Sequence, residues 1–326
     1  MTAGLLQISG VVVDLVYSVD AVPKAGEEAI VRDFAIKPGG GFNAMIASKR
    51  AGMDVYYGGA LGTGPFASIV RNALDAEAIP VLRSQDMARD QGCCTVMVDR
   101  QGERTFLASD GAEGHATIDD LKQVTASNFD WMLLSGYALH YRGSCPAIFD
   151  WLQREAPFPG LIFDPSPVVA ELPANALAAA RARATWISAN SHEAAVMTGL
   201  SDRMQSAKEL ARNAPENGGA IVRDGKHGCI VATHEICISV PAFPVTPVDT
   251  NGAGDTHLGC FIARLARGDT PVAAAHYANV AAALSTTRPG PATAPFENEV
   301  ITALGRQQQQ NSTSRAEEEL LPTQSQ

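Results

Sequence analysis

Residues 249–255 read Asp-Thr-Asn-Gly-Ala-Gly-Asp and lead into an apolar, alanine-rich stretch. The small residues Gly252, Ala253 and Gly254 let backbone N–H groups crowd around an anion at a helix start, where free donors and the helix dipole favour negative charge. Asp255 then falls in the first helical turn, within reach of a hydroxyl that attacks a bound phosphate. The segment therefore predicts a phosphate-binding corner beside a catalytic carboxylate. The alternative is an acidic residue that only caps a helix after a glycine turn.

Around this corner, short apolar segments alternate with helical segments. The predicted buried strands are 131–135, 161–164, 185–188 and 220–223, after an initial strand at 5–13. The predicted helices include 66–77, 145–154, 174–184, 252–267 and 271–286. Strands that alternate with helices are typical of a parallel sheet covered by helices on both faces.

Two hairpin-like regions, at about 15–37 and 91–108, interrupt this rhythm. We expect them to pair as a small sheet set apart from the main one, and to act as a lid that excludes water. The segment from Arg306 is polar and repetitive and lacks a periodic apolar face. We therefore predict one domain over residues 1–305 and a disordered tail over 306–326.

Composition excludes several classes of protein. The 326 residues include 25 Lys and Arg against 35 Asp and Glu, a net charge of −10. Such an acidic chain gains nothing from counterion release, so we expect no nucleic-acid partner. No apolar run is long enough to span a bilayer, and no Lys or Arg precedes Lys24, so we expect neither a membrane span nor a signal peptide. The six cysteines form no CxxC pair. Reduced thiols in a cytoplasmic protein fit this pattern.

The 249–255 string resembles the D-T-x-G-A-G-D signature of the ribokinase-like, PfkB-type carbohydrate kinases. The sequence Gly-Gly-Gly-Phe-Asn-Ala at 39–44 resembles a second signature of that family. Other matching pieces follow in the family's order, and the resemblance extends over about residues 5–304. These pieces are Asp14 after the first strand, the N-x-x-E of Asn190 and Glu193, the G-x-x-G of Gly225 and Gly228, and TRPG at 287–290.

The resemblance implies a ribokinase-like, three-layer α/β/α sandwich with a mostly parallel central sheet and a small β lid. It also implies ATP-dependent transfer of the γ-phosphoryl group to a primary hydroxyl of a sugar or nucleoside. Asp255 would be the base. Asp14, Gly40, Gly41 and Asn43 would bind the hydroxyls of the substrate. The alternatives are a kinase of a sugar phosphate and a non-catalytic sugar- or nucleoside-binding regulator.

On the nucleotide side, the resemblance points to a second group of residues. Glu193 would organise Mg²⁺ through water, and the TRPG loop leaves room for a monovalent cation such as K⁺. The pair of Asn190 and Glu193 also fits a capping box, and both roles are compatible. The residues expected to bind ATP are Asn190, Arg223, Gly225, Gly228 and Asn279. A polar residue on a helix flank is the alternative for Asn279.

The chain departs from the family pattern at two places. Arg223 stands where relatives often have Thr, and its guanidinium suits a phosphate; alternatively it pairs with Asp224 or Asp249. Residues 62–64, Gly-Thr-Gly, lack the acid of a common G-x-D, so we expect a weaker helix start there.

The sequence leaves three kinds of acceptor open: an unphosphorylated sugar, a phosphorylated sugar and a nucleoside. A phosphorylated sugar would need cations near the lid, and a nucleoside would need an apolar or aromatic clamp. The lid cations are Lys24, Arg32, Lys37, Arg89, Arg100 and Arg104. The clamp candidates are Tyr17, Phe34, Met97 and Phe106. The 39–44 segment also fits G-x-G-x-x-A, but no buried strand precedes it and no acid follows at the expected distance. Exposed lid strands could pair with a second subunit, so we expect a homodimer.

Overall fold

The computed structural model describes residues 4–153 and 160–319. Its centre is an eight-stranded sheet in the order β12-β11-β10-β9-β8-β7-β1-β4. The six strands from β10 to β4 run parallel, whereas β11 is antiparallel to both of its neighbours. The strands are β1 (Gly4–Gln7), β4 (Asp54–Tyr57), β7 (Trp131–Ser135), β8 (Gly160–Asp164), β9 (Trp186–Asn190), β10 (Gly219–Arg223), β11 (Cys229–Ala232) and β12 (Cys237–Val240). The mostly parallel sheet predicted from the alternation is confirmed.

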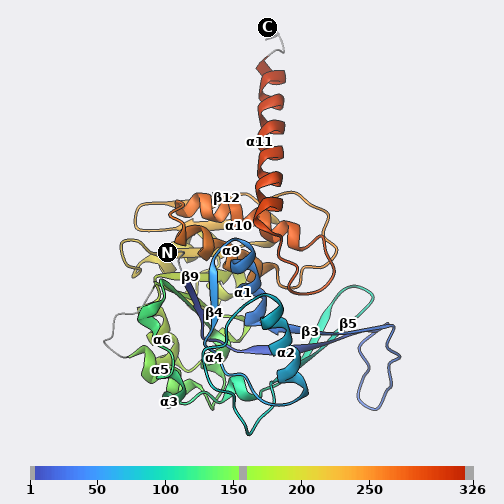
Figure 1. Cartoon of the computed structure of the whole chain (residues 1–326). Coiled ribbons are helices and arrows are strands. Elements are labelled where there is room, and N and C mark those ends of the chain that lie inside the picture. The colour runs from blue at the N-terminus through green and yellow to red at the C-terminus, as the bar shows by residue number, and fades with distance from the viewer. Residues whose placement is uncertain (1–3, 154–159, 320–326) are drawn as a thin grey trace.

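Helices cover both faces of this sheet (Figure 1). They are α1 (Gly41–Arg50), α2 (Pro65–Ala76), α3 (Ile118–Leu121), α4 (Gly136–His140), α5 (Cys145–Leu152), α6 (Ala174–Arg183), α7 (Ser191–Thr198), α8 (Arg203–Ala211), α9 (Ala253–Ala266), α10 (Pro271–Ser285) and α11 (Glu297–Glu319). Adjacent strand residues point to opposite faces. Leu5 therefore packs in one buried cluster with α1, α9 and α10, while Leu6 packs in another with α5, α6 and α8. This arrangement confirms the three-layer α/β/α sandwich.

A second, four-stranded sheet projects from one side of the body (Figure 1). Its order is β3-β2-β5-β6, and its strands are β2 (Val11–Ser18), β3 (Asp33–Gly40), β5 (Cys93–Val98) and β6 (Arg104–Ser109). The two interrupting regions thus pair as predicted. The single strand predicted at 5–13 is wrong, because the chain passes from β1 into β2 of the other sheet between Gln7 and Val11.

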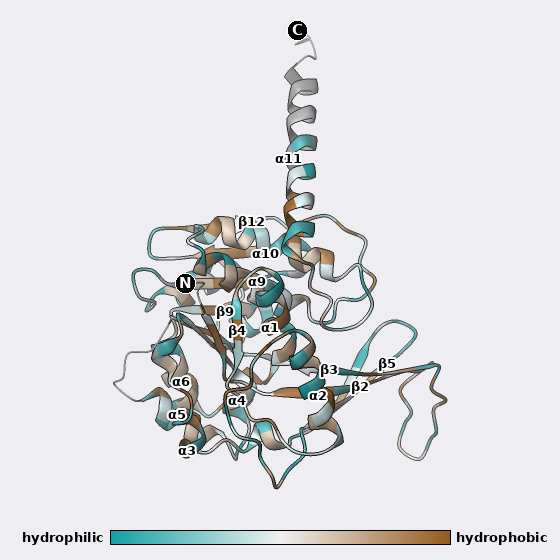
Figure 2. Ribbon diagram, in the orientation of Figure 1, coloured by the Kyte–Doolittle hydropathy of each residue, from teal (hydrophilic) through white to brown (hydrophobic). Residues whose placement is uncertain are grey.

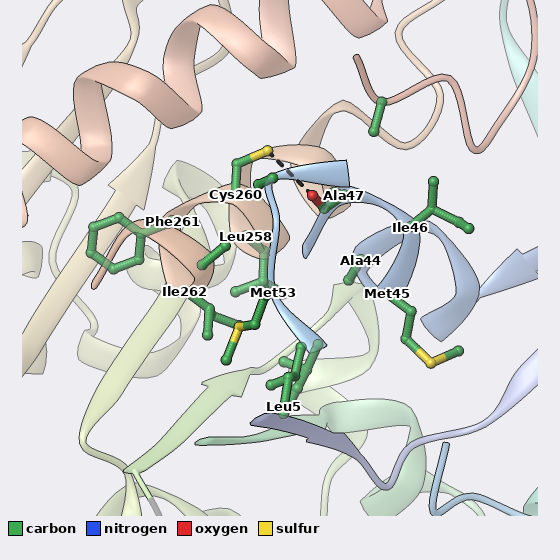
Figure 3. Close-up of a cluster of buried hydrophobic side chains, with 14 of the residues drawn as sticks. Leu5, Ala44, Met45, Ile46, Ala47, Met53, Leu258, Cys260, Phe261 and Ile262 are labelled. Carbon is green, nitrogen blue, oxygen red and sulfur yellow. Dashed lines mark hydrogen bonds between the residues drawn. The ribbon is translucent and has the colours of Figure 1, made fainter. Parts of the chain in front are cut away.

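The helices α1 and α9 pack closely enough for their backbones to touch. A Cβ atom on Gly259 would lie only 2.3 Å from the Ala44 carbonyl oxygen, so only glycine fits. The Ser48 hydroxyl donates to the Gly259 carbonyl at 3.0 Å, and the Cys260 thiol lies 3.8 Å from the Ala47 carbonyl (Figure 3). This contact fixes the start of α1 relative to the start of α9.

One local expectation differs from the structure. The start of α2 is not weakened, because the Asp90 carboxylate accepts from the N–H groups of Phe66 at 3.1 Å and Ala67 at 2.7 Å. An acid distant in sequence thus replaces the missing local one.

The last helix, α11, runs into the segment from Arg306 and stands away from the body (Figure 1). Residues 320–326 lie outside the described ranges, and the disordered tail over 306–326 stays a prediction.

Candidate active site

A cleft of about 380 Å³ lies between the lid and the carboxyl ends of the parallel strands. The last residue of each of five strands lines it: Gln7, Ser135, Asp164, Asn190 and Arg223. Ligands of open parallel sheets bind at this edge, outside the carboxyl ends of the strands. The fold therefore gathers side chains from very different parts of the sequence into one place.

The phosphate-binding corner forms one wall of this cleft. Gly252 has φ +72° and immediately precedes α9, a conformation that favours glycine. Asn251, Gly252, Gly254 and Asp255 all line the cleft. The Ala253 N–H donates to the Thr250 carbonyl at 3.3 Å, so the phosphate-binding corner stays a prediction that concerns the N–H groups of Gly252 and Gly254.

Asn43 connects this corner to α1. Its Nδ2 donates to Asp255 Oδ2 at 3.1 Å, and its Oδ1 accepts from the Ala292 N–H at 3.1 Å. The sequence analysis expects Asn43 to bind substrate hydroxyls. In the structure its amide nitrogen already donates to Asp255, and its amide oxygen already accepts from the backbone N–H of Ala292. Asn43 therefore also positions the Asp255 carboxylate.

Asp14 faces the same cleft from β2. A Cβ atom on Gly39 would lie 2.2 Å from Asp14 Oδ2, so only glycine leaves room for the carboxylate. Burial raises the pKa of Asp14 to about 6. Asp255 behaves alike: burial first, then the neighbouring Asp164 charge, raises its pKa to about 6, against the lowering effects of Asn43 and Arg223. Two carboxylates with similar pKa values therefore face one cavity.

Arg223, the last residue of β10, lines the cleft near the phosphate-binding corner. Its Nη1 donates to Asp164 Oδ2 at 3.1 Å and to the Ser188 hydroxyl at 2.7 Å, and Nη2 lies 3.5 Å from Glu193 Oε2. The expected alternatives, pairing with Asp224 or Asp249, are both wrong, because Asp224 pairs with Arg203 and Asp249 with Arg104. A Cβ atom on Gly254 would lie 3.7 Å from Arg223 Nε, so the guanidinium lies beside the phosphate-binding corner.

Asn190 and Glu193 form a complete capping box at the start of α7. Glu193 Oε2 accepts from the Asn190 N–H at 2.7 Å, and Asn190 Oδ1 accepts from the Glu193 N–H at 2.8 Å. Glu193 is 2 % exposed, yet it lines the cleft. The burial of Glu193, and the charge of Asp164 beside it, raise its pKa. Both sequence interpretations, the cap and a place in the site, fit this geometry.

Comparison with known proteins agrees with this site. The pfkB family carbohydrate kinase pattern matches residues 6–298. The chain belongs to the pfkB family of carbohydrate kinases. It is 28 % identical to the uncharacterized sugar kinase YegV of Escherichia coli over 92 % of this chain and 93 % of that one. It is also 28 % identical to the ribokinase of Bacillus subtilis, over 83 % and 89 %. Ribokinase from Giardia lamblia superimposes with a TM-score of 0.81 at 22 % identity, over 94 % of this chain and 99 % of that one.

The chain is therefore a phosphotransferase of the sugar and nucleoside kinase class, which acts on an alcohol group and uses ATP. The fold of this kinase brings most of the sequence-predicted residues to the cleft. These residues are Asp14, Gly40, Gly41, Asn43, Asn190, Glu193, Arg223, Gly252, Gly254 and Asp255. No helix within the described ranges combines the length and the apolar character needed to cross a membrane.

Four sequence-predicted residues do not line this cleft. Ala253 begins α9. Gly225 and Gly228 shape the turn after β10, with φ values of +52° and +92°. Asn279 is buried, and its Nδ2 donates to the carbonyls of Val240 at 3.1 Å and Pro241 at 3.0 Å. These contacts fit the alternative for Asn279, a polar residue on a helix flank.

The sequence did not predict three residues that line the kinase cleft: Asp164, Ser166 and Tyr137. Ser166 has φ +60° although it is not glycine, and its N–H and hydroxyl donate to Asp164 Oδ1 at 2.8 and 3.1 Å. Backbone strain of this kind is concentrated at functional sites. The available signal was position: a polar residue ending a buried strand at 161–164 belongs at the ligand-binding edge.

The pH dependence of the kinase follows from its two cleft carboxylates. In its predicted role Asp255 would accept a proton only when ionised, and Asp14 would bind substrate hydroxyls best as a carboxylate, which offers acceptors on both oxygens. Burial raises both pKa values to about 6. We expect kcat/KM for the acceptor to be constant above pH 7 and to fall below pH 6, with a slope on a logarithmic plot that exceeds one when both groups protonate. Initial rates from pH 4.5 to 8.5 measure this limb. A flat profile down to pH 5 would contradict the assignment of both carboxylates.

Proposed function

We propose that this kinase transfers the γ-phosphoryl group of ATP to a primary hydroxyl of an unphosphorylated sugar or nucleoside. The observation that carries the proposal is the meeting of Asp255 and the 252–254 corner with Asp14 and Asn43 in one cleft. Asp255 Oδ would accept the proton of the attacking hydroxyl. The hydroxyl oxygen forms the new bond to phosphorus while the bond to the ADP oxygen breaks.

Charge stabilisation supplies most of the expected rate enhancement, because phosphoryl transfer has a loose transition state. The N–H groups of Gly252 and Gly254 and the α9 dipole would stabilise the charge of the transferring group, whereas the Ala253 N–H donates to the Thr250 carbonyl. The Arg223 guanidinium lies beside Gly254 and adds a fixed positive charge. Asp255 is a weak base with a pKa of about 6, and such a base suffices where orientation of the hydroxyl is the main requirement.

We further propose that ATP is bound as its Mg²⁺ complex on the Arg223 side of the cleft. Asp164 and Glu193 line that side, although no cluster of three or more His, Cys, Asp or Glu side chains that could hold a metal occurs among the described residues. Mg²⁺ keeps several waters and needs few protein ligands. The two carboxylates would hold those waters, and the ion would supply neutralising charge to the phosphates. A monovalent cation at 287–290 stays a prediction.

A phosphorylated acceptor fits this cleft poorly. Arg223 is the one Lys or Arg side chain in its described lining, and its guanidinium is engaged by Asp164 and Glu193. Arg104 pairs with Asp249, and Lys37 Nζ lies against Gly290. Arg32 and Arg100 pair with Asp20, and Arg89 pairs with Asp86. A substrate phosphate would therefore face Asp14 without a compensating cation.

The outer face of the lid supports the proposal of a homodimer. Phe34 is 46 %, Ile36 44 % and Leu107 70 % exposed on that face, and brown, apolar stretches are visible on the lid strands in Figure 2. A second copy would cover these side chains. Light scattering should give twice the chain mass, and a monomer at micromolar concentration would contradict the dimer.

Such a kinase would act in the cytoplasm, where its nucleotide is available.

The test of the proposed function is a panel of acceptors. The purified chain is incubated with ATP, Mg²⁺ and each of several sugars, sugar phosphates and nucleosides, and the product mass is measured. We expect a gain of one phosphoryl group on an uncharged acceptor. Binding without turnover of any acceptor would instead support the non-catalytic regulator.

A further inference from the structure

Three aromatic side chains line the cleft without a role in phosphoryl transfer: Phe106, Tyr137 and Tyr141. Phe106 is 61 % exposed and Tyr137 is 41 % exposed. Neither ring stacks on another ring within the described part of the chain. Large apolar side chains left open to a cavity are available to a ligand rather than to the core.

Strand register places Phe106 on the inner face of the lid. Asp14, Cys94 and Ala108 form one cross-strand row, and all three line the cleft. The next row on that face contains Phe106, which pairs with Val96, and Val96 pairs with Val16. Opposite residues in neighbouring strands share a face. Of this row, Phe106 lines the cleft, whereas Val96 is 2 % exposed, so Phe106 is the apolar side chain that the row offers to a ligand.

The same register excludes the other clamp candidates. Tyr17 pairs with both Phe34 and Met97. It lies three residues after Asp14 in β2, and residues an odd number of positions apart in a strand point to opposite faces, so this row lies on the outer face. The rings of Tyr17 and Phe34 also stack on each other at 4.7 Å. Of the four residues that the sequence suggested, Phe106 alone lines the cleft.

Tyr137 stands across the cleft from the lid. It lies in the first turn of α4, directly beyond β7, and its N–H donates to the Ser135 hydroxyl at 3.3 Å. Tyr137 lines the same cleft as Cys94 of the lid and as Asp164 and Asp255. Phe106 and Tyr137 thus line the two walls of the space beyond Asp14.

We infer that a planar ring of the acceptor binds between Phe106 and Tyr137, and that the acceptor is a nucleoside rather than a free sugar. This inference rests on the proposed function. The ribose hydroxyls would bind Asp14 and the backbone of 39–41, which leaves the base beside Phe106 of the lid. A free sugar would leave both aromatic side chains in water. Stacking of a base on an aromatic side chain fits such a surface and tolerates several bases.

The experiment compares kcat/KM for free ribose, uridine and adenosine in the wild-type chain and two variants. Phe106→Ala removes the inner-face ring. The matched control is Ile301→Ala, which shortens a 55 % exposed apolar side chain on α11 that does not line the cleft. We expect the wild type to prefer at least one nucleoside over ribose by tenfold or more. Phe106→Ala should lower kcat/KM for that nucleoside by roughly 5- to 150-fold, mainly through KM, which is the range for one lost stack. Ribose turnover by Phe106→Ala and all activities of Ile301→Ala should change less than about twofold.

Two outcomes would overturn the inference: ribose used as well as or better than both nucleosides, or equal losses for ribose and nucleoside in Phe106→Ala. Thermal unfolding of each variant verifies the fold, which removal of a 61 % exposed side chain should not disturb. Calorimetric titration with uridine or adenosine, without ATP, separates the two proposals. Absence of all turnover, with nucleoside binding that Phe106→Ala weakens, would reject the kinase function and keep the nucleoside site. Absence of nucleoside binding together with turnover of ribose would do the reverse.

Discussion

The Asp255→Asn variant should keep its affinity for ATP and lose most of its turnover, with kcat reduced by roughly 10²–10⁴-fold. The amide preserves the size of the side chain and a hydrogen bond to Asn43, but it cannot accept the hydroxyl proton. The loss should therefore appear in kcat rather than in the KM for ATP. Steady-state rates at pH 7.5, with both substrates varied, separate these two parameters.

The matched control for this substitution is Asp75→Asn, on the exposed surface of α2. It removes the same charge from the chain without touching the cleft, and we expect unchanged kinetics. If Asp255→Asn kept more than about a tenth of the wild-type kcat, a different group would have to accept the proton. The acid limb of the pH profile should also lose its Asp255 component in any residual activity.

The Arg223→Met variant should be impaired in both stability and turnover. Its removal leaves Asp164 and Glu193, with side chains 12 % and 3 % exposed, without their shared cation. Breaking a buried ion pair costs about 3–5 kcal/mol in the free energy of unfolding. Loss of a fixed donor beside the phosphate-binding corner should lower kcat by roughly 10²–10³-fold. Urea unfolding and steady-state kinetics measure the two effects.

Second-site changes distinguish the two roles of Arg223. Arg223→Met combined with Asp164→Asn should regain part of the stability, because one unpaired charge is gone, but none of the turnover. Arg203→Met is the surface control, since Arg203 pairs with Asp224 and is 48 % exposed. Because Arg223 lowers the pKa of Asp255, the acid limb of Arg223→Met should move to higher pH. Full turnover in a stably folded Arg223→Met protein would show that this residue is structural only.

The order of elements and their class followed from the sequence. The helices predicted at 174–184 and 271–286 match α6 and α10 closely, since their alanine-rich composition and flanking signals are local. The division of the first strand between two sheets was not predictable in the same way. Residues 5–13 are mostly apolar, and only the partners of β1 and β2 decide which sheet each half joins.

The phosphate-binding corner and its carboxylate could be predicted from local sequence. A run of small residues before a helix, followed at once by an acid, places N–H donors and a carboxylate side by side through backbone geometry. The face that each side chain takes depends instead on tertiary contacts. It gave Arg223 the partners Asp164 and Glu193, engaged Asn43 with Asp255, and turned Phe106 inward while Tyr17 faces outward. The physical reason is that strand register and helix packing, which set these faces, arise from contacts between residues tens to hundreds of positions apart.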